Sequence, residues 1–225
     1  MSEQQIDAYI DIKSPWAYLA IADMRDIERD FQVALNWRPY TLDIADYLGS
    51  AKVDADGNVI EENRTPHQWR RVRYSYRNVR RYANLRGLTV RGTQKIWDSS
   101  LYNIGMLYAV EQGATEAYID IGYERFWRRE LDIEDVSVIA AVLTEAGADA
   151  AGFAAYAAAE GRAAHDRVRT DAEARGVFGV PTLILDDEIF WGREHFSLVR
   201  LMLSDQGLAR PGLEPQIDVT YARRK

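Results

Sequence analysis

The sequence of 225 residues predicts an α/β fold in which one mixed sheet carries a large, all-helical insertion. Strand patterns lie near both ends of the chain, and five helical patterns fill the stretch between them. Two strands at each end are too few for two separate sheets, so we expect them to combine into one. The expected units are one domain formed by residues 1–44 and 172–225 and a helical domain formed by residues 45–171.

The first element is a strand that turns directly into a helix. Apolar and polar residues alternate over residues 6–13, which is typical of a β-strand. Ser14 and Pro15 then favour a helix start, because the serine hydroxyl can accept from free backbone N–H groups and proline has none to lose. We expect a helix over residues 16–31 and a second strand over residues 33–39. A β-α-β unit this short implies two parallel strands with a right-handed crossover.

Ser14 has two readings at this point. It is a good helix cap, and a cap needs no further function. The same turn also directs the end of a strand and the positive end of a helix dipole at one place, which suits an anionic ligand or a thiolate.

The middle of the chain changes to helical spacing. After a turn-rich loop at residues 54–58, we expect helices over residues 65–85, 99–111, 116–129, 136–146 and 150–175. Gly113 and Gly147 stand where glycine commonly follows a helix. The first of these helices is dense in arginine and aromatic residues. We interpret its charge as a solvated or internally paired face, or as a positive rim that guides carboxylate ligands.

The last part of the chain returns to strand patterns. Residues 176–185 combine a glycine-spaced turn, a Val-Pro step and an apolar run, and residues 186–188 favour a hairpin turn. A strand at residues 189–191 should pair back, and a final helix is expected over residues 192–203. The tail from residue 209 to residue 225 is expected to be partly mobile.

Composition excludes several classes of function. A net charge of −7 argues against a general nucleic-acid binder. The chain has no cysteine, which excludes disulfides, thiolate metal sites and thiol chemistry by the protein itself. Its three histidines are far apart, so we expect no metal site. With no long apolar run and a polar N-terminus, a soluble cytoplasmic protein is expected.

Three motifs together resemble one protein family. They are Asp11-x-Lys13-Ser14-Pro15-x-x-Tyr18-Leu19-Ala20, Val177-Phe178-Gly179-Val180-Pro181-Thr182 and Trp191-Gly192. With their spacing, which covers nearly the whole chain, they make the sequence similar to the 2-hydroxychromene-2-carboxylate isomerases. These are glutathione-dependent relatives of the kappa-class glutathione transferases within the DsbA-like thioredoxin group. The resemblance implies a thioredoxin-like fold with a helical insertion, and glutathione as the cofactor.

The resemblance also implies roles for particular residues. Ser14 matches the family's active-site serine, whose hydroxyl donates to the glutathione sulfur, and it is the candidate catalytic residue. Val180 and Pro181 match the family's cis-proline step, where the backbone pairs with an extended peptide ligand. Asn63 lies in a segment similar to one that contacts the glutathione backbone, and it fits a helix-start loop equally well.

Two stretches depart from the family pattern. Residues 192–195 read Gly-Arg-Glu-His where the family has Gly-x-Asp-Arg, so Glu194, with Arg193 beside it, is expected to hold the γ-glutamyl ammonium. Residues 97–103 replace the family's segment on the substrate side. The candidate substrate contacts are Lys13, Trp16, Tyr74 and Trp97, although large aromatic residues are more often simply core.

The expected function is glutathione-dependent cis-trans isomerisation of an aromatic-derived unsaturated carboxylate, in the catabolism of aromatic compounds. Its mechanism would be reversible addition of a thiolate. Two alternatives stay open: a kappa-like glutathione transferase or peroxide-reducing enzyme, and a non-catalytic module that binds extended peptides beside Pro181. The resemblance implies a homodimer, and we expect a small-molecule substrate with neither nucleic acid nor membrane as a partner.

Overall fold

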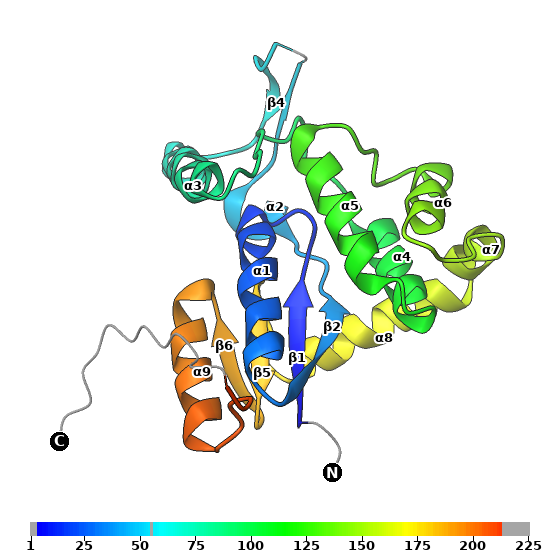
Figure 1. Cartoon of the computed structure of the whole chain (residues 1–225). Coiled ribbons are helices and arrows are strands. Elements are labelled where there is room, and N and C mark those ends of the chain that lie inside the picture. The colour runs from blue at the N-terminus through cyan, green and yellow to red at the C-terminus, as the bar shows by residue number, and fades with distance from the viewer. Residues whose placement is uncertain (1–3, 55, 213–225) are drawn as a thin grey trace.

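The computed structural model describes residues 4–54 and 56–212, and its centre is a four-stranded mixed sheet (Figure 1). The strands, in the spatial order β2-β1-β5-β6, are β2 (Val33–Pro39), β1 (Gln4–Ile10), β5 (Thr182–Leu185) and β6 (Glu188–Trp191). β1 runs parallel to β2 and antiparallel to β5, and β5 runs antiparallel to β6. The two ends of the chain therefore build one mixed sheet, as the strand patterns predicted.

Both edges of β1 are paired, because this strand lies between β2 and β5, and side chains on both of its faces are buried. Ile6, Ala8 and Ile10 are fully buried on one face, and Tyr9 is only 1% exposed on the other. The helix α1 (Pro15–Asp30) lies over the near side of β1, and α8 (Glu160–Ala174) passes behind β1 and β2 (Figure 1). The helix α9 (Phe196–Asp205) follows a short 3-10 turn and contacts α1. The site described below lies where β1 enters α1.

The middle of the chain is mostly helical and contains a short helix, α2, and a hairpin that the sequence patterns did not predict. Its helices are α2 (Ile44–Leu48), α3 (Pro66–Leu85), α4 (Ser100–Glu111), α5 (Thr115–Arg128), α6 (Val136–Glu145), α7 (Phe153–Ala158) and α8. The loop expected at residues 54–58 connects a short antiparallel hairpin of β3 (Ala51–Val53) and β4 (Val59–Glu62). The expected insertion is therefore helical apart from this hairpin, whose strands are too short to show a periodic pattern. The boundaries predicted for the two domains stay a prediction.

One predicted helix is divided in two. A continuous helix over residues 150–175 is wrong, because Ala159 leaves the helical region with φ −128° and ψ −93° between α7 and α8. The break brings the Tyr156 ring so close to Gly161 that a Cβ there would lie 2.5 Å from Tyr156 Cε1. Alanine-rich sequence favours a continuous helix locally, but tertiary packing overrides that preference.

Two glycines allow α4 and α5 to pack closely. A Cβ on Gly105 would overlap the Tyr118 hydroxyl, and a Cβ on Gly122 would overlap the Tyr102 hydroxyl. The two tyrosines stack with ring centroids 4.7 Å apart. Each hydroxyl donates to the other tyrosine's carbonyl, at 3.2 Å for Tyr102 and 2.9 Å for Tyr118. This reciprocal pair satisfies two phenol groups inside the core.

Two further findings concern only residues 4–54 and 56–212. No helix in these ranges has the length and apolar character that a membrane crossing requires. No group of three or more histidine, aspartate or glutamate side chains in them could hold a metal ion. Of the tail that the sequence predicts to be partly mobile, residues 213–225 lie outside the described residues.

Candidate active site

Ser14 caps the N-terminus of α1 at the end of the β1–α1 turn. Its backbone N–H donates to the Asp11 carbonyl at 2.9 Å, and its Oγ accepts from the Ala17 N–H at 3.2 Å. Pro15 begins the helix without needing a backbone acceptor. Ser14 is only 6% exposed, so its hydroxyl lies in a largely dry environment beside the positive end of the α1 dipole.

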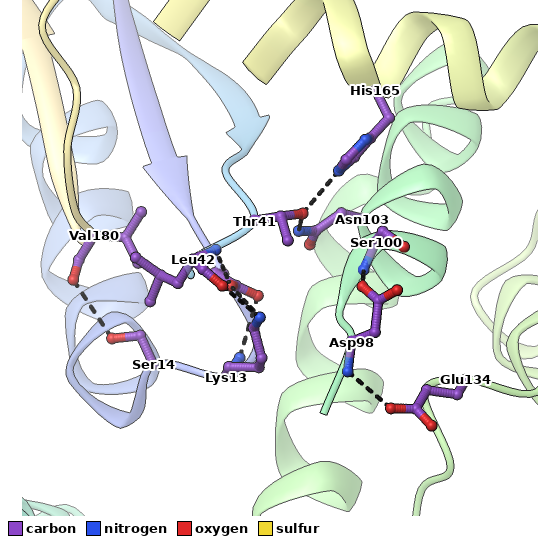
Figure 2. Close-up of polar contacts among 11 residues, drawn as sticks. Lys13, Ser14, Thr41, Leu42, Asp98, Ser100, Asn103, Glu134, His165 and Val180 are labelled. Atoms are coloured by element: carbon purple, nitrogen blue, oxygen red, sulfur yellow. Dashed lines mark hydrogen bonds and ion pairs between the residues drawn. The ribbon is translucent and has the colours of Figure 1, made fainter. Parts of the chain in front are cut away.

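Ser14 faces the peptide bond that precedes Pro181. The Val180–Pro181 bond is cis, as predicted, and Ser14 Oγ donates to the Val180 carbonyl at 3.4 Å (Figure 2). A hydrogen bond of this length is weak, so the hydroxyl can turn to another acceptor at little cost. In the part of the chain that the structure describes, the Val180 N–H has no acceptor. One donor and one weakly held hydroxyl thus lie side by side.

Two cavities adjoin at this point. The apolar cavity, of about 500 Å³, has Trp16, Tyr76, Trp97 and Phe178 among its walls, and Lys13 and Ser14 also line it. The cis-proline cavity, of about 560 Å³, is lined by Val180 and Pro181 together with Tyr82, Arg193 and Glu194. Both cavities share Trp16, Val180 and Trp191. Clefts of this size suit small molecules, and Ser14 lies close to where the two meet.

Lys13 and Asp11 form a buried ion pair at the edge of the apolar cavity. Asp11 is fully buried, and its Oδ2 accepts from the Leu42 N–H at 2.8 Å and lies 3.8 Å from Lys13 Nζ. Lys13 Nζ donates to the Leu42 carbonyl at 2.7 Å (Figure 2). The Lys13 N–H donates to Asp11 Oδ1 at 3.3 Å. Burial raises the pKa of the Asp11 carboxyl, although the Lys13 ammonium and the Leu42 N–H act in the opposite direction.

The segment that holds this ion pair is itself held from behind. Thr41 Oγ1 lies 2.7 Å from His165 Nε2 of α8 and accepts from Asn103 Nδ2 of α4 at 2.8 Å (Figure 2). His165 Nδ1 is 3.0 Å from an oxygen of Asp166, which favours the tautomer with the proton on Nδ1. Two helices of the middle block thereby fix the position of Leu42.

Arg193 and Glu194, which the sequence placed together in a glutathione site, differ in their partners. Arg193 donates through Nε and Nη2 to one oxygen of Asp23, at 2.9 and 2.8 Å, and lies over the Tyr82 ring. Glu194 is exposed and pairs with no cation among the described residues. Arg193 shares Asp23 with Arg86, so its guanidinium is held within the chain. Glu194 is the charged group of the two that is left without a partner of opposite charge among the described residues.

The structure brings together some of the candidate residues and separates others. Lys13, Trp16 and Trp97 line the apolar cavity with Ser14. Asn63 and Tyr74 line neither cavity: Asn63 Oδ1 accepts from the Ser50 N–H at 2.6 Å, and Tyr74 is 55% exposed. The binding roles of these two residues stay predictions.

Sequence reasoning did not select several residues of the apolar cavity. Phe178 belongs to the motif at residues 177–182 but was given no role there. No local sequence pattern marks Leu42, Tyr76 or Lys95 as a binding residue. All of them come from segments far from Ser14 in the sequence. Only the fold brings them to the cavity.

These groups suit one kind of ligand. A peptide-like molecule could use the Val180 N–H, an ammonium could pair with Glu194, and an anionic atom could accept from Ser14 beside the helix N-terminus. An apolar or aromatic molecule would fit the neighbouring cavity.

The comparisons with known proteins agree on a fold. The family model described as DSBA-like thioredoxin domain matches residues 5–203. A curated protein of Sphingobium xenophagum named 2-hydroxychromene-2-carboxylate isomerase is 29% identical over 201 residues, which cover 89% of this chain and 98% of that protein. A solved 2-hydroxychromene-2-carboxylate isomerase has a TM-score of 0.70 at 23% identity, with 91% of this chain and 96% of the other covered. The cytosolic disulfide reductase DsbM from Pseudomonas aeruginosa, solved with GSH, has a TM-score of 0.60 at 17% identity, with 90% and 98% covered.

Proposed function

The chain belongs to the family of DSBA-like thioredoxin domains, and on that premise we propose that it is a glutathione-dependent cis-trans isomerase of an unsaturated, aromatic-derived carboxylate. The observation that carries the proposal is the position of Ser14. Its hydroxyl caps α1, faces the cis Val180–Pro181 bond and lies beside two adjoining cavities. The isomerase name of the Sphingobium xenophagum relative supports the reaction class.

The residues of the cis-proline cavity fit glutathione. Its peptide backbone would pair with the Val180 N–H, which has no acceptor within the described residues. Its ammonium would pair with the carboxylate of Glu194, and its sulfur would accept from the Ser14 hydroxyl. Since the chain has no cysteine, the thiol has to arrive with the ligand.

When bound, glutathione would supply a thiolate that adds reversibly to a conjugated double bond and thereby permits rotation before the double bond is restored. Ser14 and the α1 N-terminus would stabilise the thiolate by lowering the pKa of the thiol. The Lys13 ammonium would attract the substrate's carboxylate, and Trp16 and Trp97 would provide aromatic walls that exclude water. No atom or electron is gained or lost overall, so no oxidant is needed.

The test is calorimetric titration of the wild type and Ser14→Ala with glutathione, combined with ultraviolet titration of the bound thiol. We expect the wild type to bind glutathione and to lower its thiol pKa by about one unit or more, and Ser14→Ala to lose this shift. The substitution also removes a helix cap, so Asp135→Ala serves as the matched control. It removes the cap of α6, an exposed aspartate away from both cavities, and should leave the thiol pKa unchanged.

A second candidate function is favoured by one observation. Phe178 and Trp191 are 61% and 48% exposed, and their ring centroids lie 4.9 Å apart next to the cis-proline step. Such a pair suits an extended peptide that also uses the Val180 N–H. If the wild type binds no glutathione and Ser14→Ala behaves in the same way, the enzyme proposal is wrong and the peptide-binding module is favoured.

If glutathione does bind, the reaction decides between two enzymes. Turnover of hydroxychromene carboxylates without consumption of glutathione would support the isomerase. Conjugation to chlorodinitrobenzene alone would identify a kappa-like transferase instead. The homodimer and the cytoplasmic location stay predictions.

A further inference from the structure

A third cavity, here called the basic cavity, has positive walls in an acidic protein. It measures about 290 Å³, and α3 and residues 92–96 provide most of its lining. Arg73, Arg77, Arg80 and Lys95 are among its lining residues, and no aspartate or glutamate lines it. The Lys95 ammonium is ion-paired with Glu134, so the three arginines provide the positive charge that is left for a ligand. The chain as a whole carries a net charge of −7. A cavity with several cations and no carboxylate is a place where an anion is stabilised.

Three arginines of this cavity lack the carboxylate partners that several other arginines of the fold have. Arg73, Arg77 and Arg80 form no ion pair with any described residue, whereas Arg25 and Arg193, for example, each bind an aspartate. Their guanidinium groups lie 5.4 to 5.7 Å from the centroids of aromatic rings on the same helix. Stacking of this kind orients the guanidinium and leaves its N–H groups available.

A glycine leaves room where two guanidinium groups converge. A Cβ on Gly92 would lie 3.4 Å from Arg80 Nη2 and 3.9 Å from Arg129 Nη2. Both side chains are anchored nearby, because Arg80 Nε donates to the Val90 carbonyl at 2.9 Å and Arg129 Nε donates to the Gly92 carbonyl at 2.6 Å. Of these two arginines only Arg80 lines the basic cavity, and its hydrogen bond to Val90 holds its guanidinium at the cavity wall.

The basic cavity adjoins the apolar cavity. Both are lined by Arg64, Val72, Tyr76, Thr93, Lys95 and Ile96. Figure 1 shows α3 at the margin of the molecule, beside the β3–β4 hairpin and away from the central sheet. A single elongated molecule could therefore have its apolar part beside Ser14 and an anionic end over α3.

We propose that the basic cavity is an anion-binding subsite for a carboxylate or phosphate group at the far end of the ligand that occupies the apolar cavity. The ligand class is an aromatic acid with a second anionic group, remote from the atoms near Ser14. The aromatic part of this statement rests on the proposed function. The anion site itself rests only on Arg73, Arg77 and Arg80, which line the cavity and form no ion pair with a described residue.

Binding of anions without glutathione tests this subsite. Calorimetric titrations with inorganic pyrophosphate, naphthalene-2-carboxylate and naphthalene-2,6-dicarboxylate would be made on the wild type and two double variants. Arg73→Gln with Arg77→Gln removes two arginines that make no hydrogen bond to a described residue. Arg70→Gln with Arg81→Gln is the matched control, since it removes the same charge from exposed positions of α3 outside the cavities.

We expect the wild type to bind the dicarboxylate at least about tenfold more tightly than the monocarboxylate. The Arg73/Arg77 variant should lose this preference and weaken pyrophosphate binding about tenfold, while the Arg70/Arg81 control should change either by less than about twofold. Equal affinity for the two naphthalene acids in the wild type would overturn the proposal. Equal losses of anion affinity in both double variants would overturn it too. The affinity would then come from the overall positive charge of α3 and not from the cavity.

The arginine-to-lysine version of the Arg73/Arg77 pair guards against a folding artefact, because it keeps the charge and should recover part of the pyrophosphate affinity. None of these titrations contains glutathione. Failure of the anion subsite and failure of the proposed isomerase are therefore separate outcomes.

Discussion

Replacement of Lys13 by methionine would test the buried ion pair beside the apolar cavity. The variant loses the 2.7 Å hydrogen bond to the Leu42 carbonyl, worth about 1 kcal/mol. It also leaves the fully buried carboxylate of Asp11 without its counter-charge, and breaking a buried pair in this way costs about 3–5 kcal/mol. Asp11 keeps the N–H groups of Leu42 and residue 13, so we expect the lower end of that range for the broken pair and a total loss of about 4 kcal/mol.

The loss should depend on pH in a defined direction. Burial already raises the pKa of Asp11 in the wild type, and loss of the Lys13 ammonium would raise it further. A raised carboxyl pKa destabilises the fold as pH increases above the unfolded value of about 4, and this cost is complete above the folded pKa. Below the folded pKa, Asp11 takes up a proton. The free-energy penalty then shrinks by about 1.4 kcal/mol for each pH unit, down to the unfolded pKa. The difference between wild type and variant should therefore be smaller at pH 5 than at pH 8.

The assay is urea unfolding at both pH values, followed by tryptophan fluorescence and far-ultraviolet circular dichroism. Lys52→Met is the matched control, because Lys52 and Glu61 form a 3.7 Å pair whose side chains are 52% and 72% exposed. We expect a change of less than about 0.5 kcal/mol for this control at either pH. A loss below about 1 kcal/mol for Lys13→Met at pH 8, or an equal loss at pH 5, would refute the reasoning.

Three further predictions concern other contacts. Burial raises the pKa of Asp7, but hydrogen bonds from Arg175 and from a second arginine lower it by more, so Asp7→Asn should cost about 2 kcal/mol near neutral pH. In urea titrations this cost should disappear as the pH falls from about 4 through the lowered pKa, and a cost that persists in acid would contradict it. Gly122→Ala places a methyl against the Tyr102 hydroxyl and should lower stability by about 1–3 kcal/mol, whereas an unchanged Tm in calorimetry would show that α4 and α5 can separate freely. Ser14→Ala should lose about 1 kcal/mol from the lost cap, measured by urea unfolding, and no loss would mean that the 3.2 Å bond to Ala17 contributes nothing.

Local signals in the sequence were sufficient for the β1–α1 turn and the cis-proline strand. Ser14 and Pro15 act on the backbone within one helical turn, so their effect can be predicted without knowing the fold. The same is true of the alternation in β1 and of the turn at Asp186 and Asp187, which both adopt the positive φ values that such a hairpin needs. The cis geometry of Val180–Pro181 came from the family resemblance, and the structure confirms it.

Tertiary packing decided what local signals could not. The break at Ala159 places the Tyr156 ring against Gly161, although the local composition favours a continuous helix. Asn63 and Arg193 were expected to bind glutathione, but the Ser50 N–H already donates to Asn63 Oδ1 and Arg193 already pairs with Asp23. Which polar groups remain available to a ligand depends on partners that are distant in the sequence.

The sequence by itself determined the mixed sheet, the serine that caps the start of α1 and the absence of a thiol in the chain. Only the tertiary structure decided that Lys13 pairs with Asp11 and donates to the Leu42 carbonyl. It also decided that Glu194 has no cation beside it among the described residues, and that arginines of α3 line a cavity next to the apolar cavity. The physical reason is the range of the interactions. Caps, turns and strand alternation act over a few residues, whereas a binding site is made of groups that meet only when the chain has folded.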